Sequence, residues 1–242
     1  QLILPPGESP HTFSPTAKDK RAFDASEKIF VVGHLLDDWV VNSVTDSSKI
    51  VTMDTNISLL PSNHMGHSDH KDGEFDPHYW LDPRNAVHIS HNIAREYGNI
   101  DPENIDYYQE QAVLFSTNVR DLYAQQLIST ESIREKPFVT VHSGWSYFSD
   151  VFNLRHVGTF EPASGEHPTP RYLKNLQDTI QREGATVIFS EPQLSTNSVY
   201  AFASDNNLKI AVLDPIGGSS QTLSYQEIIS FNIQALLENL DK

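Results

Sequence analysis

The feature that most constrains the fold is a long stretch with helical periodicity in the middle of the chain. Between residues 102 and 130, apolar side chains recur at spacings of three to five residues, which places them on one face of a helix. These residues are Ile105, Tyr108, Ala112, Phe115, Val119, Leu122 and Leu127. Asp101 and Pro102 supply a cap and a first-turn proline. We therefore expect one long, rigid helix over 102–131, more than twice the usual length of ~11–12 residues.

Short apolar segments of strand length lie on both sides of this helix and alternate with amphipathic stretches. The predicted strands are Leu2–Leu4, Ile29–Val32, Ile50–Met53, Phe138–Val141, Val187–Phe189 and Ile210–Leu213. The other predicted helices are Thr16–Ser26, Leu35–Ser43, Asn85–Tyr97, Tyr147–Asn153, Pro170–Glu183, Thr196–Asn206 and Tyr225–Leu240. This alternation predicts an α/β fold with mainly parallel sheets. Because the long helix separates the strands into two groups, we predict an N-terminal lobe over 1–101, a linking helix over 102–131 and a C-terminal lobe over 132–242.

Charge and composition exclude several classes of protein. The 242 residues include 32 acidic and 17 basic side chains, a formal net charge of −15, and so acidic a chain repels the phosphate backbone of nucleic acids. The chain has no cysteine, so any metal ion must be bound by imidazole and carboxylate groups. No segment has the ~20 consecutive apolar residues of a membrane-spanning helix.

Four residues that can bind a metal ion lie at strand ends or beside turn-forming prolines. His142 and Asp214 directly follow predicted strands, His11 follows the first strand through a proline-glycine turn, and His78 precedes a predicted helix. Ligands of open α/β sheets bind at the carboxyl ends of the strands. Three imidazoles and one carboxylate suit tetrahedral zinc, whereas manganese prefers more oxygen. The four residues form no local motif, so the residues alone leave open that each histidine is an ordinary surface or core residue.

A second group of histidines lies in a polar segment between Pro61 and Pro77. His64, His67 and His70 fall within residues 62–74, which have no hydrophobic period and are predicted to form a surface loop. This loop has two interpretations: it captures, delivers or senses zinc at low affinity, or it is a solvated loop that binds zinc only incidentally. The other five histidines are interpreted as structural: His34, His88, His91, His156 and His167.

Five motifs resemble those of a known family in order, spacing and context. They are Pro5–Phe13, Asp76–Pro83 (Asp-Pro-His-Tyr-Trp-Leu-Asp-Pro), Val141–Phe148 (Val-His-Ser-Gly-Trp-Ser-Tyr-Phe), Ser190–Gln193 and Leu213–Gly217. The chain resembles the solute-binding proteins of the zinc and manganese ABC importers, sometimes called cluster A-I. In that family the first three motifs carry the metal histidines, which correspond to His11, His78 and His142. The last motif carries an aspartate, here Asp214, that some members use as a fourth ligand; Glu8 or a water molecule is the alternative.

The resemblance implies two α/β lobes joined by one long helix, with the metal site in the cleft between the lobes. It implies a protein that binds Zn²⁺ without turnover in the periplasm, or at the cell surface on a lipid anchor. The expected partner is the permease subunit of an ABC importer, and membrane contact is expected only through that subunit or an anchor. The family's usual first strand and helix are absent before the proline-glycine turn, so we expect the first lobe to be partly missing from this sequence.

The identity of the metal rests on the third histidine. Manganese-type members of the family often carry glutamate where this chain has His142, so the nitrogen-rich set favours zinc. A manganese- or iron-binding member of the same family is one alternative.

A zinc-dependent hydrolase is another alternative, because three histidines with an open position also describe catalytic zinc. However, the chain has no His-Glu-x-x-His or Gly-x-Ser-x-Gly motif. A third alternative is that the protein is a surface adhesin or interaction protein.

Overall fold

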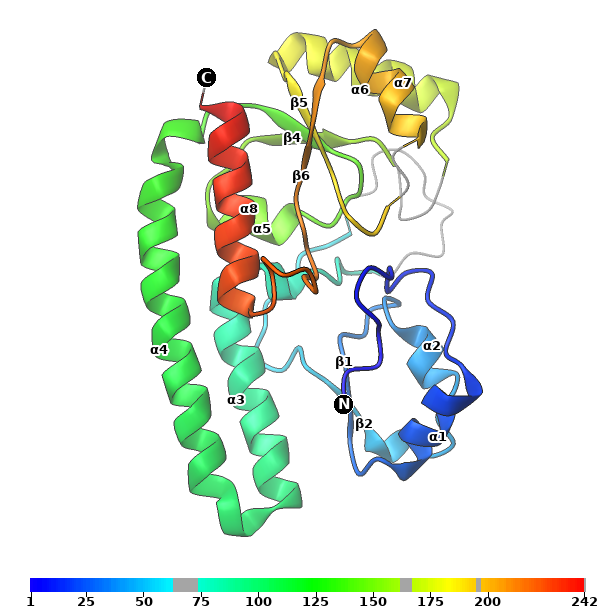
Figure 1. The fold of residues 1–242 in the computed structure, drawn as a ribbon, viewed down its shortest axis with the longest axis vertical. Helices are drawn as coiled ribbons and strands as arrows, with labels where there is room; N and C mark the ends of the chain where they lie inside the picture. The colour runs from blue at the N-terminus through cyan, green and yellow to red at the C-terminus, as the bar shows by residue number, and fades with distance from the viewer. Residues whose placement is uncertain (63–73, 162–166, 195–196, 242) are drawn as a thin grey trace. The chain divides into compact units, whose positions relative to one another are not determined.

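The computed structural model describes residues 1–62, 74–161, 167–194 and 197–241. These residues divide into two compact units, one formed by 1–62 and 74–123 and the other by 124–241. The predicted α/β class, with parallel sheets and one long helix, is confirmed (Figure 1). Among the described residues, no helix is both long and apolar enough to cross a membrane.

In the described part of the first unit, a small parallel sheet and three α-helices precede the long helix. Strands β1 (Ile29–Val31) and β2 (Ile50–Thr52) pair in parallel. The helices are α1 (Ala17–Ala25), α2 (Asp38–Val41) and α3 (Pro83–Ile100). Phe23, Ile29, Val31 and Val40 form the core of the sheet region. Local sequence explains where two helices begin: Thr16 and Asp19 form a capping box before α1, and Asp82 caps α3 ahead of Pro83.

Two predictions in this unit are wrong. The segment Leu2–Leu4 is not a strand; Leu2 is 82% exposed, and Pro5 and Pro6 follow at once without an N–H to extend a sheet. The predicted helix Leu35–Ser43 shortens to α2, Asp38–Val41. It starts late because Gly33, His34 and Leu35 all have positive φ, at 81°, 54° and 70°, and left-handed residues do not join a right-handed helix.

The second unit contains a four-stranded parallel sheet with helices packed against it. Its strand order is β4-β3-β5-β6, with β3 at Phe138–Thr140, β4 at His156–Thr159, β5 at Val187–Ser190 and β6 at Lys209–Val212. Parallel neighbouring strands need crossover connections. These are the helices α5 (Ser146–Val151), α6 (Pro170–Glu183) and α7 (Asn197–Asp205). The helix α8 (Tyr225–Leu240) follows β6. The strands run in one direction, so the residues that follow β3, β5 and β6 lie at one edge (Figure 1).

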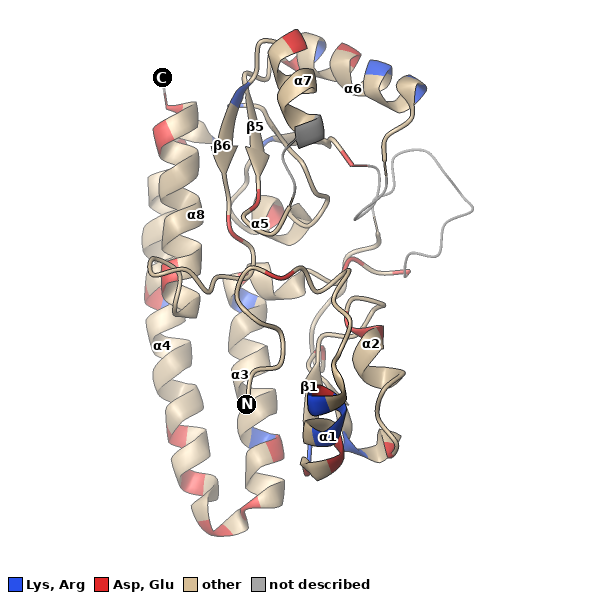
Figure 2. Ribbon diagram, turned by 45° about the vertical axis from the view of Figure 1, so that its right-hand side comes forward, with Lys and Arg blue, Asp and Glu red and all other residues tan. Residues whose placement is uncertain are grey.

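The core and surface of this unit follow from simple patterning. Val139, Ile188, Leu176 and Ile180 belong to one buried cluster between the sheet and α6. The outer face of α6 carries interleaved basic and acidic residues (Figure 2), including a Lys174–Asp178 pair at 3.2 Å one helical turn apart. Strand β4 was not among the predicted strands, because its sequence His-Val-Gly-Thr has a single apolar side chain and a glycine.

The long helix α4 runs from Ile105 to Ser129, with 3-10 turns at Pro102–Asn104 and Thr130–Ile133. Its inward positions Ala112, Ser116 and Val119 are buried. The helix begins in the first unit and its last turns belong to the second.

His156 gives the second unit a defined response to acid. Its ring stacks on Phe138, with centroids 5.3 Å apart, and its Nε2 lies 3.0 Å from Thr140 Oγ1. The Thr140 hydroxyl donates to the His142 carbonyl at 2.7 Å, so His156 Nε2–H is the donor to Thr140. Burial lowers the pKa of His156 from 6.5 to about 4. The unfolded chain therefore binds this proton first, and the free energy of unfolding falls as pH drops from about 6.5 toward 4.

The substitution His156→Gln keeps a hydrogen-bond donor and removes the titration. Between pH 7 and pH 4.5 the variant should lose about 2 kcal/mol less unfolding free energy than the parent protein. Urea unfolding at several pH values measures this difference. His88→Gln, an exposed position on α3, is the matched control and should leave the slope unchanged. Parallel pH profiles for His156→Gln and the parent would contradict the assignment.

Candidate metal centre

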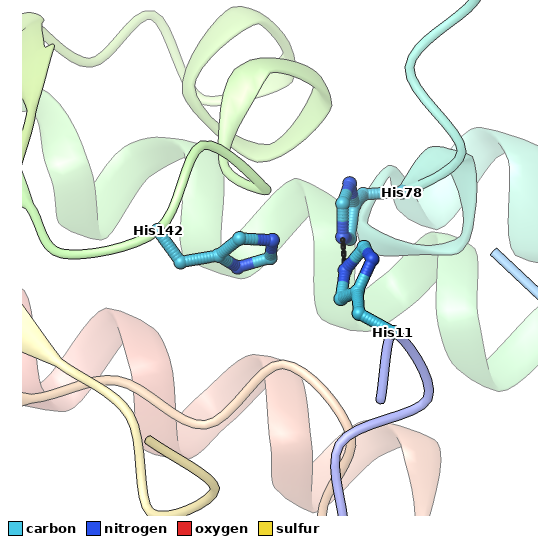
Figure 3. Close-up of side chains that lie close together, drawn as sticks. All are labelled: His11, His78 and His142. Carbon is cyan, nitrogen blue, oxygen red and sulfur yellow. Dashed lines mark hydrogen bonds between the residues drawn. The ribbon is translucent and has the colours of Figure 1, made fainter. Parts of the chain in front are cut away.

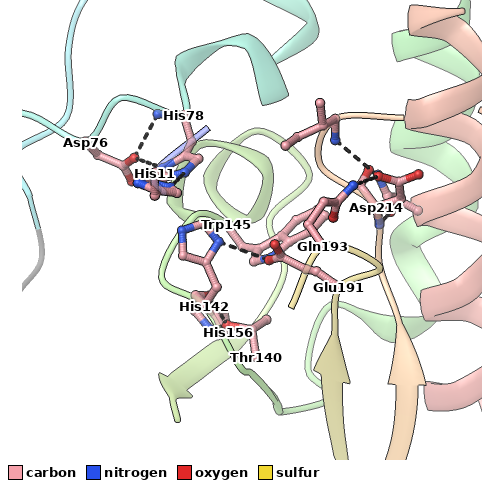
Figure 4. A network of polar contacts seen from close by, with 12 residues as sticks. His11, Asp76, His78, Thr140, His142, Trp145, His156, Glu191, Gln193 and Asp214 are labelled. Atoms are coloured by element: carbon pink, nitrogen blue, oxygen red, sulfur yellow. Dashed lines mark hydrogen bonds and ion pairs between the residues drawn. The ribbon is translucent and has the colours of Figure 1, made fainter. Parts of the chain in front are cut away.

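His78 in the first unit is held by a neighbouring carboxylate. It lies directly before the 3-10 turn Tyr79–Leu81 and is 4% exposed. Asp76 Oδ1 lies 2.7 Å from His78 Nδ1 and also accepts the backbone N–H of His78 at 2.9 Å (Figure 4). A carboxylate accepts and does not donate, so Nδ1 carries the proton. Nε2 therefore keeps its lone pair, the arrangement that prepares an imidazole to bind a metal ion.

His11 presents its ring to that same nitrogen. The Nε2 atoms of His11 and His78 lie 3.2 Å apart (Figure 3). Two nitrogens bound to one tetrahedral zinc ion at ~2.0–2.1 Å would lie about 3.3 Å from each other. The spacing of the pair therefore already suits two ligands of one ion. In this structure the contact is a hydrogen bond in which His11 Nε2–H donates to the His78 Nε2 lone pair.

His142 in the second unit has the same kind of support. It is the second residue after β3 and is 3% exposed. Its Nδ1 lies 3.1 Å from Glu191 Oε1, and the indole N–H of Trp145 donates to the same oxygen at 2.8 Å (Figure 4). Glu191 directly follows β5, the neighbour of β3. The parallel register of the two strands therefore brings carboxylate and imidazole together, and His142 keeps the lone pair of Nε2 for a ligand.

The orienting roles of Asp76 and Glu191 were not predicted. Both residues lie within the quoted motifs, Asp76 two positions before His78 and Glu191 in Ser190–Gln193. The signal available in the sequence was the residue type: a buried metal-ligating histidine needs an acceptor for its second nitrogen. Nothing in the spacing of residues 142 and 191 indicated that they pair.

Asp214 follows β6 and is 2% exposed, and its carboxylate is bound inside its own unit. Oδ1 accepts hydrogen bonds from the backbone of Ile216 (3.2 Å) and Gly217 (2.9 Å) and from Gln193 Nε2 (3.1 Å). Oδ2 accepts one from the Thr222 hydroxyl at 2.9 Å. These bonds occupy Oδ1 fully, so any ligand contact of Asp214 must use the second lone pair of Oδ2.

The structure describes some of the remaining residues considered in the sequence and not others. His64, His67 and His70 lie outside the described residues. Glu8 is exposed, and its backbone N–H donates to the Pro5 carbonyl at 3.2 Å. His34 Nε2 lies 2.9 Å from Asp54 Oδ2, which fits the structural role expected of it.

The histidine pair and His142 thus lie in different units. The structure brings His11 and His78 together within the first unit. It places His142 and Asp214 at the same sheet edge of the second unit. In each unit a buried carboxylate contacts Nδ1 of the histidine and leaves the lone pair on Nε2.

The carboxylate contacts make a prediction that needs no metal ion. Nitrogen-15 NMR of the metal-free protein at neutral pH should show His78 and His142 as Nδ1–H tautomers. Glu191→Gln weakens the acceptor, so His142 should become a mixture of tautomers while His78 stays unchanged. Asp76→Asn should do the reverse, which makes each variant the control for the other. An Nε2–H tautomer at either histidine in the unaltered protein would contradict the hydrogen-bond assignment.

Similarity to known proteins places the chain in a family. The sequence profile described as "Zinc-uptake complex component A periplasmic" matches residues 1–239. The high-affinity zinc uptake system protein ZnuA of Brucella abortus is 30% identical over 145 residues, 60% of this chain and 43% of the relative, so the match spans less than half of that protein. The metal ABC transporter substrate-binding lipoprotein SloC of Streptococcus mutans is 24% identical and is matched over 99% of this chain and 82% of its own length.

A solved structure agrees with the fold. The crystal structure of a ZnuA protein superposes with a TM-score of 0.84 at 23% identity, covering 99% of this chain and 90% of that one. The family description and the name of the Brucella relative both describe components of zinc-uptake systems. The profile match over almost the whole chain shows that this protein belongs to the family of periplasmic zinc-uptake component A proteins.

Proposed function

We propose that this protein captures Zn²⁺ outside the cytoplasm and delivers it to the membrane permease of an ABC importer. The observation that carries the proposal is the 3.2 Å separation of the Nε2 atoms of His11 and His78, because it matches the separation of two imidazole ligands on one zinc ion. His142 supplies the third nitrogen. It is buried and prepared in the same way, with its Nδ1 on a carboxylate. Zinc is the cargo of the protein and undergoes no reaction.

The donor set supports zinc over manganese. Three imidazole nitrogens are a softer set than the oxygen-rich shells that manganese prefers, and the chain has no cysteine to recruit other soft metals. The Brucella relative carries zinc uptake in its name. We propose Asp214 Oδ2 for the fourth position; the alternatives are Glu8 and a water molecule. His64, His67 and His70 form an auxiliary group in this proposal and raise the local concentration of zinc near the site.

The family supports a proposal for where the protein acts and which membrane protein it contacts. The family description names a periplasmic component, and the Streptococcus relative is named as a substrate-binding lipoprotein of a metal ABC transporter. We therefore propose a periplasmic or lipid-anchored protein that contacts the membrane through the permease. A hydrolytic zinc centre is disfavoured, because Asp214 at the fourth position would leave no bound water to activate.

Removing a proposed ligand should weaken zinc binding strongly. Loss of an outer-shell partner of a metal-ligating histidine already costs about 10–100-fold in affinity, so His78→Ala or His142→Ala should cost more than about 100-fold. Competitive titration with a fluorescent zinc chelator, paired with unfolding curves to verify the fold, measures this loss. His88→Ala, exposed on α3, is the control and should bind zinc like the parent.

The same titration with Mn²⁺ tests the choice of metal. The parent protein should bind zinc more tightly than manganese, and elemental analysis of protein purified without added metal should find zinc. Unchanged zinc affinity in His78→Ala would refute the ligand assignment. Preferential retention of manganese would refute the cargo, and hydrolase activity abolished by His142→Ala would replace the proposed function with the enzymatic alternative.

A further inference from the structure

His11 lies outside every helix and strand of the first unit, so the position of its imidazole depends on contacts of the residues beside it. Trp39 makes two of these contacts. Its indole N–H donates to the Pro10 carbonyl at 3.0 Å. Its ring packs edge-on against Phe13, with centroids 4.8 Å apart at 70°. The segments on both sides of His11 are therefore held by one side chain.

Trp39 is itself tied to the end of β1. It lies on the short helix α2, which begins directly after Asp37. The buried Asp37 carboxylate accepts the backbone N–H groups of Val32 (2.7 Å) and Gly33 (2.8 Å). These bonds hold the left-handed turn of residues 33–35, in which the non-glycine residues His34 and Leu35 are strained. Because Asp37 directly precedes α2, the same bonds tie the start of α2, and with it the indole, to the end of the strand.

The other histidine of the pair is tied to the same place. Tyr79 follows His78 directly and is fully buried. Its hydroxyl donates to the Val32 carbonyl at 2.9 Å. The Val32 residue is thus bound on its N–H side by Asp37 and on its C=O side by Tyr79. Three hydrogen bonds, Trp39 to Pro10, Val32 to Asp37 and Tyr79 to Val32, and the short backbone from Asp37 to Trp39 connect the neighbours of the two histidines. Pro10 directly precedes His11, and Tyr79 directly follows His78.

We propose that Trp39 is a positioning residue for metal capture, which sets the separation of the His11 and His78 nitrogens through its hydrogen bond to the Pro10 carbonyl. The proposal rests on the proposed function, since it assigns a role in building the same site. Trp39 does not touch the ion. It keeps His11 within reach of the ion that His78 and His142 bind in the proposed function.

Trp39→Phe removes the N–H donor and keeps an aromatic ring against Phe13. Loss of one hydrogen bond of about 1 kcal/mol corresponds to a several-fold change, so zinc affinity should fall about three- to tenfold. A double-mutant cycle separates positioning from general damage. In a His11→Ala background, Trp39→Phe should cost nothing further, because the residue it positions is gone. In a His142→Ala background the same substitution should keep its full effect.

Carbon-13 NMR of the histidine rings in metal-free protein gives a readout that does not depend on zinc binding. Trp39→Phe should shift the His11 ring resonances and leave those of His142 in place. If alanine at His11 and His78 has no effect on zinc affinity, the proposed function fails while this NMR result still decides whether Trp39 positions His11. Phe13→Leu, which removes the edge contact and keeps the indole, serves as the second variant and should shift His11 less.

Two results would overturn the proposal. One is an equal loss of zinc affinity from Trp39→Phe in the presence and absence of His11. The other is an unshifted His11 ring in folded Trp39→Phe protein. Should Trp39→Phe fail to fold, Trp39→Tyr, which also removes the indole N–H and keeps an aromatic ring, is judged by the same cycle and the same resonances.

Discussion

The hydrogen bond from imidazole Nδ1–H to a buried carboxylate is the interaction on which the proposed chemistry depends. In the part of the chain that the structure describes, His78 makes it to Asp76 in one unit and His142 makes it to Glu191 in the other. Each carboxylate decides which nitrogen carries the proton, and so leaves Nε2 with a lone pair. Without these acceptors the rings could rotate or change tautomer, and a buried histidine would be an unreliable ligand. The burial of both pairs strengthens the effect, because hydrogen bonds to charged acceptors gain from a low local dielectric.

The two units reach this arrangement by different routes. In the second unit the parallel sheet positions the residues: β3 and β5 are neighbours, so the residues that follow them lie at the same edge. In the first unit the sheet has only two strands, and His11 and His78 come from irregular segments. Their positions depend on local devices instead, including the Asp-Pro-His turn and the hydrogen bonds around Val32. The first unit is therefore the part where small polar changes should matter most for binding.

Much of the fold could be predicted, because periodicity and caps are local signals. The helices α6 and α8 begin and end at the predicted residues, and the long helix α4 lies within its predicted range. The errors have physical causes that a linear pattern does not carry. Leu2–Leu4 is apolar enough for a strand and finds no strand partner, and the left-handed turn at residues 33–35 delays α2. Strand β4 was missed because His-Val-Gly-Thr carries only one apolar side chain.

The site was predictable to a different degree. Residue type and placement, at predicted strand ends for His11, His142 and Asp214 and before a helix for His78, singled out the four residues, and family motifs added their context. The strand predicted before His11 does not form, so that part of the reasoning was wrong. Pairings across 49 and 29 residues, such as Glu191 with His142 and Trp39 with Pro10, exist only in three dimensions. The hydrogen bonds that occupy Asp214 Oδ1 likewise depend on the turn after β6, and they narrow its use as a ligand to one oxygen.

The central claim is that three imidazole Nε2 atoms, from both units, bind one zinc ion. The most direct measurement is a crystal structure of the zinc-loaded protein with anomalous data at the zinc edge. The account predicts one fully occupied ion with His11, His78 and His142 bound through Nε2 at about 2.0–2.1 Å and one oxygen in the fourth position. An ion held by residues of one unit alone, or bound through Nδ1 of His78 or His142, would contradict it.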